Sequence, residues 1–291
     1  MSNRITIVEV GPRDGLQNEA TNVPTEAKVA FIDALSQSGL PVIETTSFVS
    51  PKAVPQMADA VAVMAGIERA PGVRYLVLTP NEKGLDRAIE ANVDSIALFT
   101  SATEEFCQAN IRCSIDESFV RFEPVVARAK ERNIWVRGYV SVAFVCPFSG
   151  DVDPNRAVSV GARLLRLGCD EICFADTIGR AVPAQVAALL DLAKPVVPVE
   201  ITALHVHDTG GNALANIDVA IDRGVRIIDG AAGGLGGCPF APGAPGNAAT
   251  EAIVRHLHKR GFDTGVDADR IEAAVAIVRP FLSGRASLVP A

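Results

Sequence analysis

The feature that most constrains the fold is an alternation of strand-like and helix-like segments that repeats along almost the whole chain. Eight short runs of β-branched and apolar residues are each followed by a turn and an amphipathic stretch. The predicted strands are Ile5–Val10, Val42–Phe48, Val73–Thr79, Ser95–Thr100, Trp135–Ala143, Glu171–Thr177, Ile201–His207 and Arg226–Ala231. Because strands that alternate with helices form parallel sheets, eight units predict an α/β fold of the (β/α)8 type, a TIM barrel.

The helical segments support the same architecture. Thr25–Ser38, Ile115–Arg132 and Arg156–Leu167 have helical spacing, and Pro24, Pro55 and Pro183 stand where helices are expected to start, each as a possible first helical residue. An open doubly wound sheet is the alternative, but no GxGxxG or GxxxxGK motif follows the first strand. We expect one catalytic domain over 1–291, with the barrel at about 4–262 and a C-terminal helical extension at about 266–291 that begins with one additional helix from Asp267.

Composition excludes several classes of function. The chain has 27 Lys and Arg against 34 Asp and Glu, a net charge of −7, so it lacks the basic face that nucleic acids require. No apolar run reaches the roughly 18 residues of a membrane span. The six cysteines include no CxxC pair, which favours reduced thiols and a cytoplasmic location.

In a barrel of this type, reactive side chains lie at the carboxyl ends of the strands. Arg13 and Asp14 follow the first strand. An aspartate oxygen is a ligand for a hard divalent cation, and an arginine offers several donors to an enolate or carboxylate oxygen. The alternative is that Asp14 and Gly15 only form a turn.

Glu44 lies within an otherwise apolar second strand, where an unpaired charge is costly. It therefore needs a partner, and Arg13 on the neighbouring strand is the natural one. We expect Glu44 to hold Arg13 in place, although the pair could be purely structural.

The seventh strand carries His205 and His207, which point to the same face because residues i and i+2 of a strand do so. Two imidazoles facing the barrel interior, with a carboxylate two strands away, are typical of a metal site. The alternative is one core histidine and one surface histidine. His256 and His258 fall in a helical stretch and do not share a face, so we interpret them as solvated or packing residues.

A glycine-rich segment, 233–247, follows the eighth strand and contains Cys238. Its composition predicts a mobile lid over the barrel mouth, with the thiol available as an acid, base or nucleophile. A phosphate-binding loop with an incidental cysteine is the alternative. Asn247, near the next helix, is either an N-cap or a neutral oxygen ligand.

Further polar residues stand near other strand ends and are weaker candidates for substrate contact or catalysis. Asp176 is expected to meet Arg137 or a metal-bound water. The remaining candidates are Tyr139 on the fifth strand, Thr177 after the sixth, and Asn110, Cys113 and Ser114 after the fourth.

Four stretches, taken in order, resemble the 3-hydroxy-3-methylglutaryl-CoA (HMG-CoA) lyase family. They are VEVGPRDGLQNE, ETTSFVSPK, HVHDT and GLGGCPFAPGAPGN, and the similarity extends over roughly residues 4–284. The cysteine-containing glycine loop is the most specific of the four. The resemblance implies a TIM-barrel lyase that cleaves HMG-CoA to acetyl-CoA and acetoacetate.

The resemblance also implies roles for particular residues. A divalent cation, Mg²⁺ or Mn²⁺, would be bound by Asp14, His205, His207 and Asn247. Arg13 would stabilise charge on the thioester oxygen and Cys238 would exchange a proton with the acetyl-CoA carbanion. The base for the hydroxyl proton is left open between a group on the His207 side of the site and Asp176. Together with the positions at strand ends, this gives an expected catalytic set of Arg13, Cys238, Glu44, Asp176 and His205 and an expected substrate-binding set of Arg13, Asn110, Ser114, Tyr139 and Thr177. By analogy with other barrel lyases we expect a homodimer or higher homo-oligomer.

Three stretches, Val142–Ser149, Cys173–Ala175 and the turn Thr209–Asn212, differ from the usual family pattern and would affect the walls around the acyl group. A related substrate, such as citramalyl-CoA or a longer-chain 3-hydroxyglutaryl-CoA, therefore stays open. An acetyl-CoA-condensing synthase of the same superfamily and a non-catalytic CoA-binding protein are further alternatives.

Overall fold

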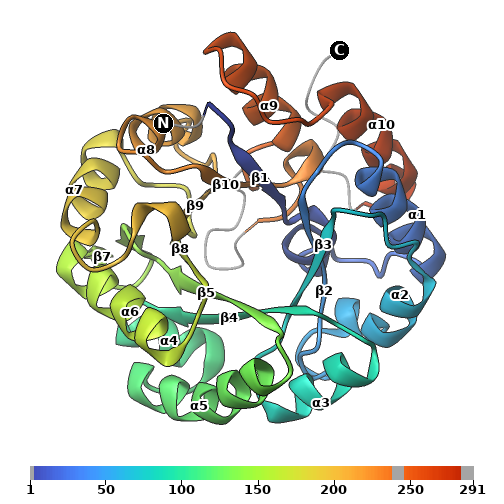
Figure 1. Ribbon diagram of the computed structural model, residues 1–291, viewed down its shortest axis with the longest axis horizontal. Coiled ribbons are helices and arrows are strands. Elements are labelled where there is room, and N and C mark those ends of the chain that lie inside the picture. Colours follow the sequence, from blue (N-terminus) through green and yellow to red (C-terminus); the bar gives the residue numbers. More distant parts are fainter. Residues whose placement is uncertain (1–2, 238–245, 283–291) are drawn as a thin grey trace.

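Eight parallel strands close into a barrel in the computed structural model, which describes residues 3–237 and 246–282 (Figure 1). Around the barrel the strand order is β1-β10-β9-β8-β5-β4-β3-β2. Their bounds are β1 Thr6–Glu9, β2 Val42–Ser47, β3 Arg74–Leu78, β4 Ser95–Ser101, β5 Trp135–Ser141, β8 Glu171–Asp176, β9 Thr202–Val206 and β10 Ile227–Gly230. Each matches a predicted strand, and the predicted TIM barrel is confirmed.

The strands are built mostly from apolar and β-branched residues because both of their faces are covered. Every residue of β2 and of β8 is buried. One face packs inside the barrel and the other against the surrounding helices, which is the usual environment of a parallel sheet.

The helices form an outer ring around the barrel (Figure 1). They are α1 Thr25–Ser36, α2 Ala60–Gly66, α3 Glu82–Glu90, α4 Glu104–Ile111, α5 Ile115–Glu131, α6 Pro154–Leu167, α7 Pro183–Ala193, α8 Ala213–Asp222, α9 Thr250–Lys259 and α10 Ala268–Val278. None of them is long and apolar enough to cross a membrane within the described part of the chain. The additional helix expected from Asp267 is α10, which contacts both α1 and α9.

The three prolines that were expected to open helices behave differently from one another. Pro183 is the first residue of α7, as predicted. Pro24 instead precedes α1 as its N-cap residue. Pro55 begins a short 3-10 turn, Pro55–Met57, and α2 starts only at Ala60.

Several local features near the barrel mouth have no counterpart in the sequence predictions. A π-helical turn, Gly11–Gly15, follows β1, and a 3-10 turn, Ala232–Gly234, follows β10. A two-stranded hairpin of β6 Val145–Cys146 and β7 Gly150–Asp151 follows β5. The pairing of β2 with β3 shifts register between Glu44 and Thr46. Irregularities of this kind commonly direct side chains at functional sites.

Candidate active site

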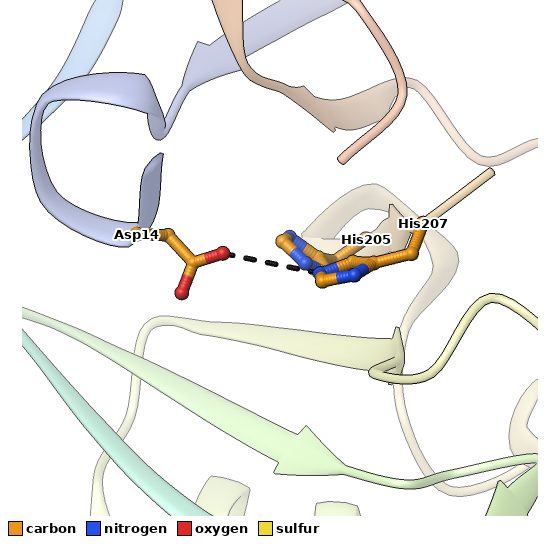
Figure 2. Close-up of side chains that lie close together, drawn as sticks. All are labelled: Asp14, His205 and His207. Atoms are coloured by element: carbon orange, nitrogen blue, oxygen red, sulfur yellow. Dashed lines mark ion pairs between the residues drawn. The ribbon is translucent and has the colours of Figure 1, made fainter. Parts of the chain in front are cut away.

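Asp14, His205 and His207 come together at the barrel mouth, with one potential ligand atom of each lying within 4.8 Å of the others (Figure 2). Asp14 belongs to the π-helical turn after β1, and the two histidines belong to the end of β9 and the residue after it. Only β10 separates β1 from β9. The sequence prediction that a carboxylate two strands away would face the two imidazoles therefore agrees with the geometry.

Asn247 joins this cluster. Its side-chain Nδ2 donates hydrogen bonds to Asp14 Oδ2 at 2.8 Å and to the backbone oxygen of Leu235 at 3.0 Å. It does not cap a helix, because Ala249 is the N-cap residue of α9. Its Oδ1 atom is buried and has no hydrogen-bond partner among the described residues. A buried acceptor of this kind normally has a partner, so this oxygen is suited to a ligand from outside the chain.

The protonation states of the cluster are those that a cation requires. Burial opposes charge on Asp14, but neighbouring Arg13, the two histidines and the Asn247 amide hold its pKa at about 2. Burial, with His205 nearby, lowers the pKa of His207 to about 3. At neutral pH, Asp14 is therefore a carboxylate and His207 a neutral imidazole. These ionised and neutral donors, with the free Asn247 oxygen, fit a divalent cation.

Arg13 is held by two carboxylates. Its Nε and Nη2 atoms lie 2.8 and 2.6 Å from Glu44 Oε2, and its Nη1 donates to Asp14 Oδ1 at 2.7 Å. Burial raises the pKa of Glu44, and this effect is opposed by the guanidinium of Arg13. The Tyr139 hydroxyl donates to the same Glu44 oxygen at 3.5 Å. The pairing of Arg13 with Glu44 that the sequence suggested is thus present.

Asp176 does not contact Arg137, which was one of the two partners predicted for it. Its two carboxylate oxygens accept backbone N–H bonds from Arg180 and Ala181, each at 3.0 Å. Burial raises the pKa of Asp176 to about 6, although these backbone bonds favour the charged form. Arg137 instead pairs with Asp229, at 2.6 Å, and with Glu171, at 3.2 Å.

Asp229 is a site residue that the sequence analysis did not identify. It lies in β10, and its Oδ2 is 3.2 Å from His205 Nδ1. The signal was available, because Asp229 is a charge in the apolar run Ile227–Gly230, just as Glu44 is in the second strand. The glycines that follow Asp229 form the stronger pattern at this position and predict a loop.

A cavity of about 780 Å³ opens beside the cluster and is lined by Arg13, Asp14, His205, His207, Tyr139, Asn110 and Thr177, among others. Thr177 also accepts the backbone N–H of Val142 at 2.8 Å. Ser114 is not among the lining residues. It is the N-cap residue of α5, where it forms a capping box with Glu117, so the prediction that it contacts substrate is not supported.

The glycine-rich segment is described up to Gly237 and again from Gly246. Gly236 packs on the Asp14 turn so closely that a β-carbon there would lie 2.9 Å from Asn247 Nδ2 and 3.1 Å from Gly15 Cα. In this described part the glycine permits close packing and does not indicate a mobile lid. Cys238 and the remainder of the expected lid lie outside the described residues.

A closed (β/α)8 barrel with a carboxylate, two imidazoles and an amide at the carboxyl ends of its strands defines a barrel protein with a candidate metal site. A family model described as HMGL-like matches residues 4–278. The chain therefore belongs to this family, the HMG-CoA lyase family.

Individual relatives agree with this assignment. A curated protein from Danio rerio named 3-hydroxy-3-methylglutaryl-CoA lyase, cytoplasmic, is 53% identical over 263 residues, 90% of this chain and 78% of that protein. The crystal structure of the HMG-CoA lyase from Brucella melitensis is 51% identical with a TM-score of 0.93, covering 95% of this chain and 98% of that one. An HMG-CoA lyase structure from Acinetobacter baumannii, in complex with coenzyme A and 3-methylmalate, is 37% identical with a TM-score of 0.91, covering 100% and 98%.

Proposed function

We propose that the protein cleaves HMG-CoA to acetyl-CoA and acetoacetate and that it uses a divalent cation, Mg²⁺ or Mn²⁺, to do so. Family membership supports the reaction. The observation that supports the cation most directly is the convergence of Asp14, His205 and His207 beside the unpartnered oxygen of Asn247. These four residues would hold the ion.

The reaction needs a proton to leave the tertiary hydroxyl on carbon 3 while the bond between carbons 2 and 3 breaks. When bound, the cation would supply Lewis acidity that lowers the pKa of that hydroxyl. The electron pair of the broken bond passes to carbon 2, so negative charge develops on the thioester oxygen of the departing acetyl-CoA enolate. Carbon 3 becomes the ketone carbon of acetoacetate.

Arg13 is the residue suited to that developing charge. Glu44 and Asp14 fix its guanidinium at the cavity wall, so little reorganisation is required when the enolate forms. A donor that is oriented in advance stabilises a transition state more than its ground state. Glu44 and Tyr139 then act by positioning Arg13.

Two proton transfers complete the reaction. Cys238 is proposed to donate a proton to carbon 2 of the enolate. The hydroxyl proton is proposed to go to the histidine pair, because both histidines line the cavity whereas Asp176 is engaged by two backbone amides and is not among the lining residues. His205 is the candidate base, since the pKa of His207 is held near 3 by burial. A neutral imidazole has one lone pair, so His205 would leave the cation to Asp14, His207 and Asn247 when it accepts the hydroxyl proton. Return of that proton to the Cys238 thiolate through solvent would restore both groups.

The outer part of the cavity suits the coenzyme. Lys52, Arg112 and Arg121 line it, together with apolar side chains such as Phe106 and Phe122. Three cations at the rim would attract the phosphates of an acyl-CoA, and the apolar wall would pack along its pantetheine arm. Asn110, which also lines this part, is proposed to contact the substrate.

The first test is turnover of HMG-CoA by purified protein, followed as acetoacetate, with Mg²⁺ or Mn²⁺ and a thiol reductant. We expect rapid release that EDTA abolishes and added cation restores. Citramalyl-CoA, and acetyl-CoA together with a 2-oxo acid, are tested as substrates in parallel assays. Faster turnover of either would overturn the proposed substrate, and no reaction on any of them, with the cation bound, would overturn the proposed activity.

We also propose a reducing, cytoplasmic location and a homo-oligomeric state. The cysteines of the described residues, Cys107, Cys113, Cys146, Cys169 and Cys173, are all free, as reduced thiols are in the cytoplasm. Curated relatives carry both cytoplasmic and mitochondrial names, so cell fractionation must decide the compartment. Light scattering on the purified protein measures the oligomeric state.

A further inference from the structure

A chain of buried charges runs beneath the candidate site. Asp229, fully buried in β10, places Oδ2 3.2 Å from His205 Nδ1 and Oδ1 2.6 Å from Arg137 Nη2. Arg137, fully buried in β5, reaches Glu171 Oε1 of β8 with its Nε at 3.2 Å. Four strands thus contribute to one line of groups that ends on His205.

We propose that Asp229 is a positioning residue that holds His205 with its proton on Nδ1. A carboxylate has only acceptor atoms, so the nitrogen that faces it must donate. Nε2 is then the one nitrogen of His205 that keeps a lone pair for a cation or for a substrate proton. The use made of that lone pair rests on the proposed function, whereas the position of the proton does not.

Arg137 explains why this position requires a carboxylate. A guanidinium has donors and no acceptor, so the atom 2.6 Å from Arg137 must be an oxygen. Asp229 has a second oxygen left for His205. An asparagine would have only one oxygen, and with that oxygen on Arg137 its amide NH₂ would face Nδ1 of His205. The ring would then carry its proton on Nε2, which removes the lone pair from the cavity side.

Two other groups near Asp229 do not replace it as the hydrogen-bond acceptor for His205 Nδ1. The Cys173 thiol lies 3.7 Å from the same Oδ2 atom, and a thiol is only a weak donor. The Tyr139 ring packs edge-on against His205, at 6.4 Å between ring centroids, and its hydroxyl donates to Glu44. Asp229 is therefore the acceptor that determines the tautomer of His205.

The experiment is nitrogen-15 NMR of the metal-free protein labelled at its four histidines, with a His205→Gln variant to assign the resonances. In the unmodified chain we expect a protonated Nδ1 and an unprotonated Nε2 for His205. Asp229→Asn should move the proton to Nε2 and weaken Mn²⁺ binding, measured by EPR titration, by about 10- to 100-fold, the usual cost of losing such a partner.

Glu171→Gln is the matched control, because it makes the same carboxylate-to-amide change on the far side of Arg137. It should leave both the His205 tautomer and the Mn²⁺ affinity as in the unmodified chain. An Nε2 proton in the unmodified chain would overturn the proposal even if Asp229→Asn failed to fold. So would an Asp229→Asn protein that kept the Nδ1 proton. If His205 carries its proton on Nδ1 but the protein does not cleave HMG-CoA, only the proposed function is contradicted.

Discussion

At the residue scale, the chemistry of the barrel mouth depends on how Arg13 is shared between two carboxylates. The Nε and Nη2 atoms of Arg13 pair with Glu44, and its Nη1 atom donates to Asp14. Arg13 thereby connects the group proposed to stabilise the enolate with one proposed ligand of the cation. The variants Arg13→Gln and Cys238→Ser test the proposed enolate stabilisation and the proposed proton transfer separately.

Replacing Arg13 by Gln should slow turnover of HMG-CoA by two to three orders of magnitude, the usual effect of losing one oxyanion donor, about 3 kcal/mol of transition-state stabilisation. The fold should be kept, because the amide can still donate to Glu44. Steady-state kinetics with circular dichroism as a check on folding measures this. Turnover within a few-fold of the unmodified chain would show that Arg13 does not stabilise the enolate.

Replacing Cys238 by Ser should lower turnover and leave the metal content unchanged, because a serine hydroxyl is a far weaker acid than a thiol. Turnover and metal analysis of the same sample give both readings. A variant that loses its metal would show that Cys238 acts in binding the ion, contrary to the proposed proton transfer.

Much of the candidate site could be predicted from single residues of the sequence. Glu44 stood out as a charge within an apolar strand, and His205 and His207 as an alternating pair. Asp229 gives the same signal as Glu44 but occupies a strand of only four residues, Ile227–Gly230, beside a glycine-rich turn. The partners of Asp176 were not predictable, because they are backbone amides that a loop supplies.

At the scale of elements, Glu9 ties together three segments that carry the site. Its Oε1 accepts N–H bonds from Gly11, in the turn that bears Asp14, and from Ala232, in the turn after β10. Its Oε2 lies 2.6 Å from the hydroxyl of Thr250, the first residue of α9. Burial raises the pKa of Glu9 to about 8, although these three hydrogen bonds favour the charged form.

This raised pKa predicts how stability varies with pH. The stabilisation from a protonated Glu9 is complete below its unfolded value near 4.5 and is lost as pH rises through about 8. Glu9→Gln imitates the protonated side chain, since its oxygen can accept both N–H bonds while its amide donates to Thr250. The melting temperature should therefore fall less between pH 5 and pH 9 in Glu9→Gln than in the unmodified chain. Equal losses would contradict a neutral Glu9.

Elements were predictable where their pattern was long. Each barrel strand was predicted, because a parallel strand covered on both faces consists mostly of apolar and β-branched residues. The π-helical turn Gly11–Gly15 was not predicted, because its five residues do not establish a helical period. The β6–β7 hairpin has two residues in each strand, too few to show alternation.

At the scale of the whole molecule, the candidate site lies across the seam where the last barrel strand meets the first. Each residue of β1 from Thr6 to Glu9 pairs with one of β10 from Ile227 to Gly230. Asp14 follows β1, whereas Asn247 follows β10. The Nδ2 atom of Asn247 lies 2.8 Å from Oδ2 of Asp14. A cation bound there would connect both ends of the sheet.

Such a cation should stabilise the whole fold. Binding to the folded state alone adds about 2.7 kcal/mol at a free concentration one hundred times the dissociation constant. We expect thermal unfolding of metal-free protein to shift upward by several degrees on adding Mn²⁺ or Mg²⁺.

Two variants make this measurement specific. Asp14→Asn should lose most of the shift, because the ion loses its charged ligand. His256→Gln should keep it, because His256 lies in α9 and pairs with Asp218 away from the site. An equal shift in Asp14→Asn would place the cation elsewhere.

The pairing of β1 with β10 also has a consequence for how the protein is made. Asp14 is synthesised before the other three proposed ligands, at positions 205, 207 and 247. A nascent or truncated chain that stops before residue 205 therefore holds only one of the four. Tight metal binding then requires synthesis through residue 247 and closure of the barrel, so metal loading would report that β1 and β10 have paired.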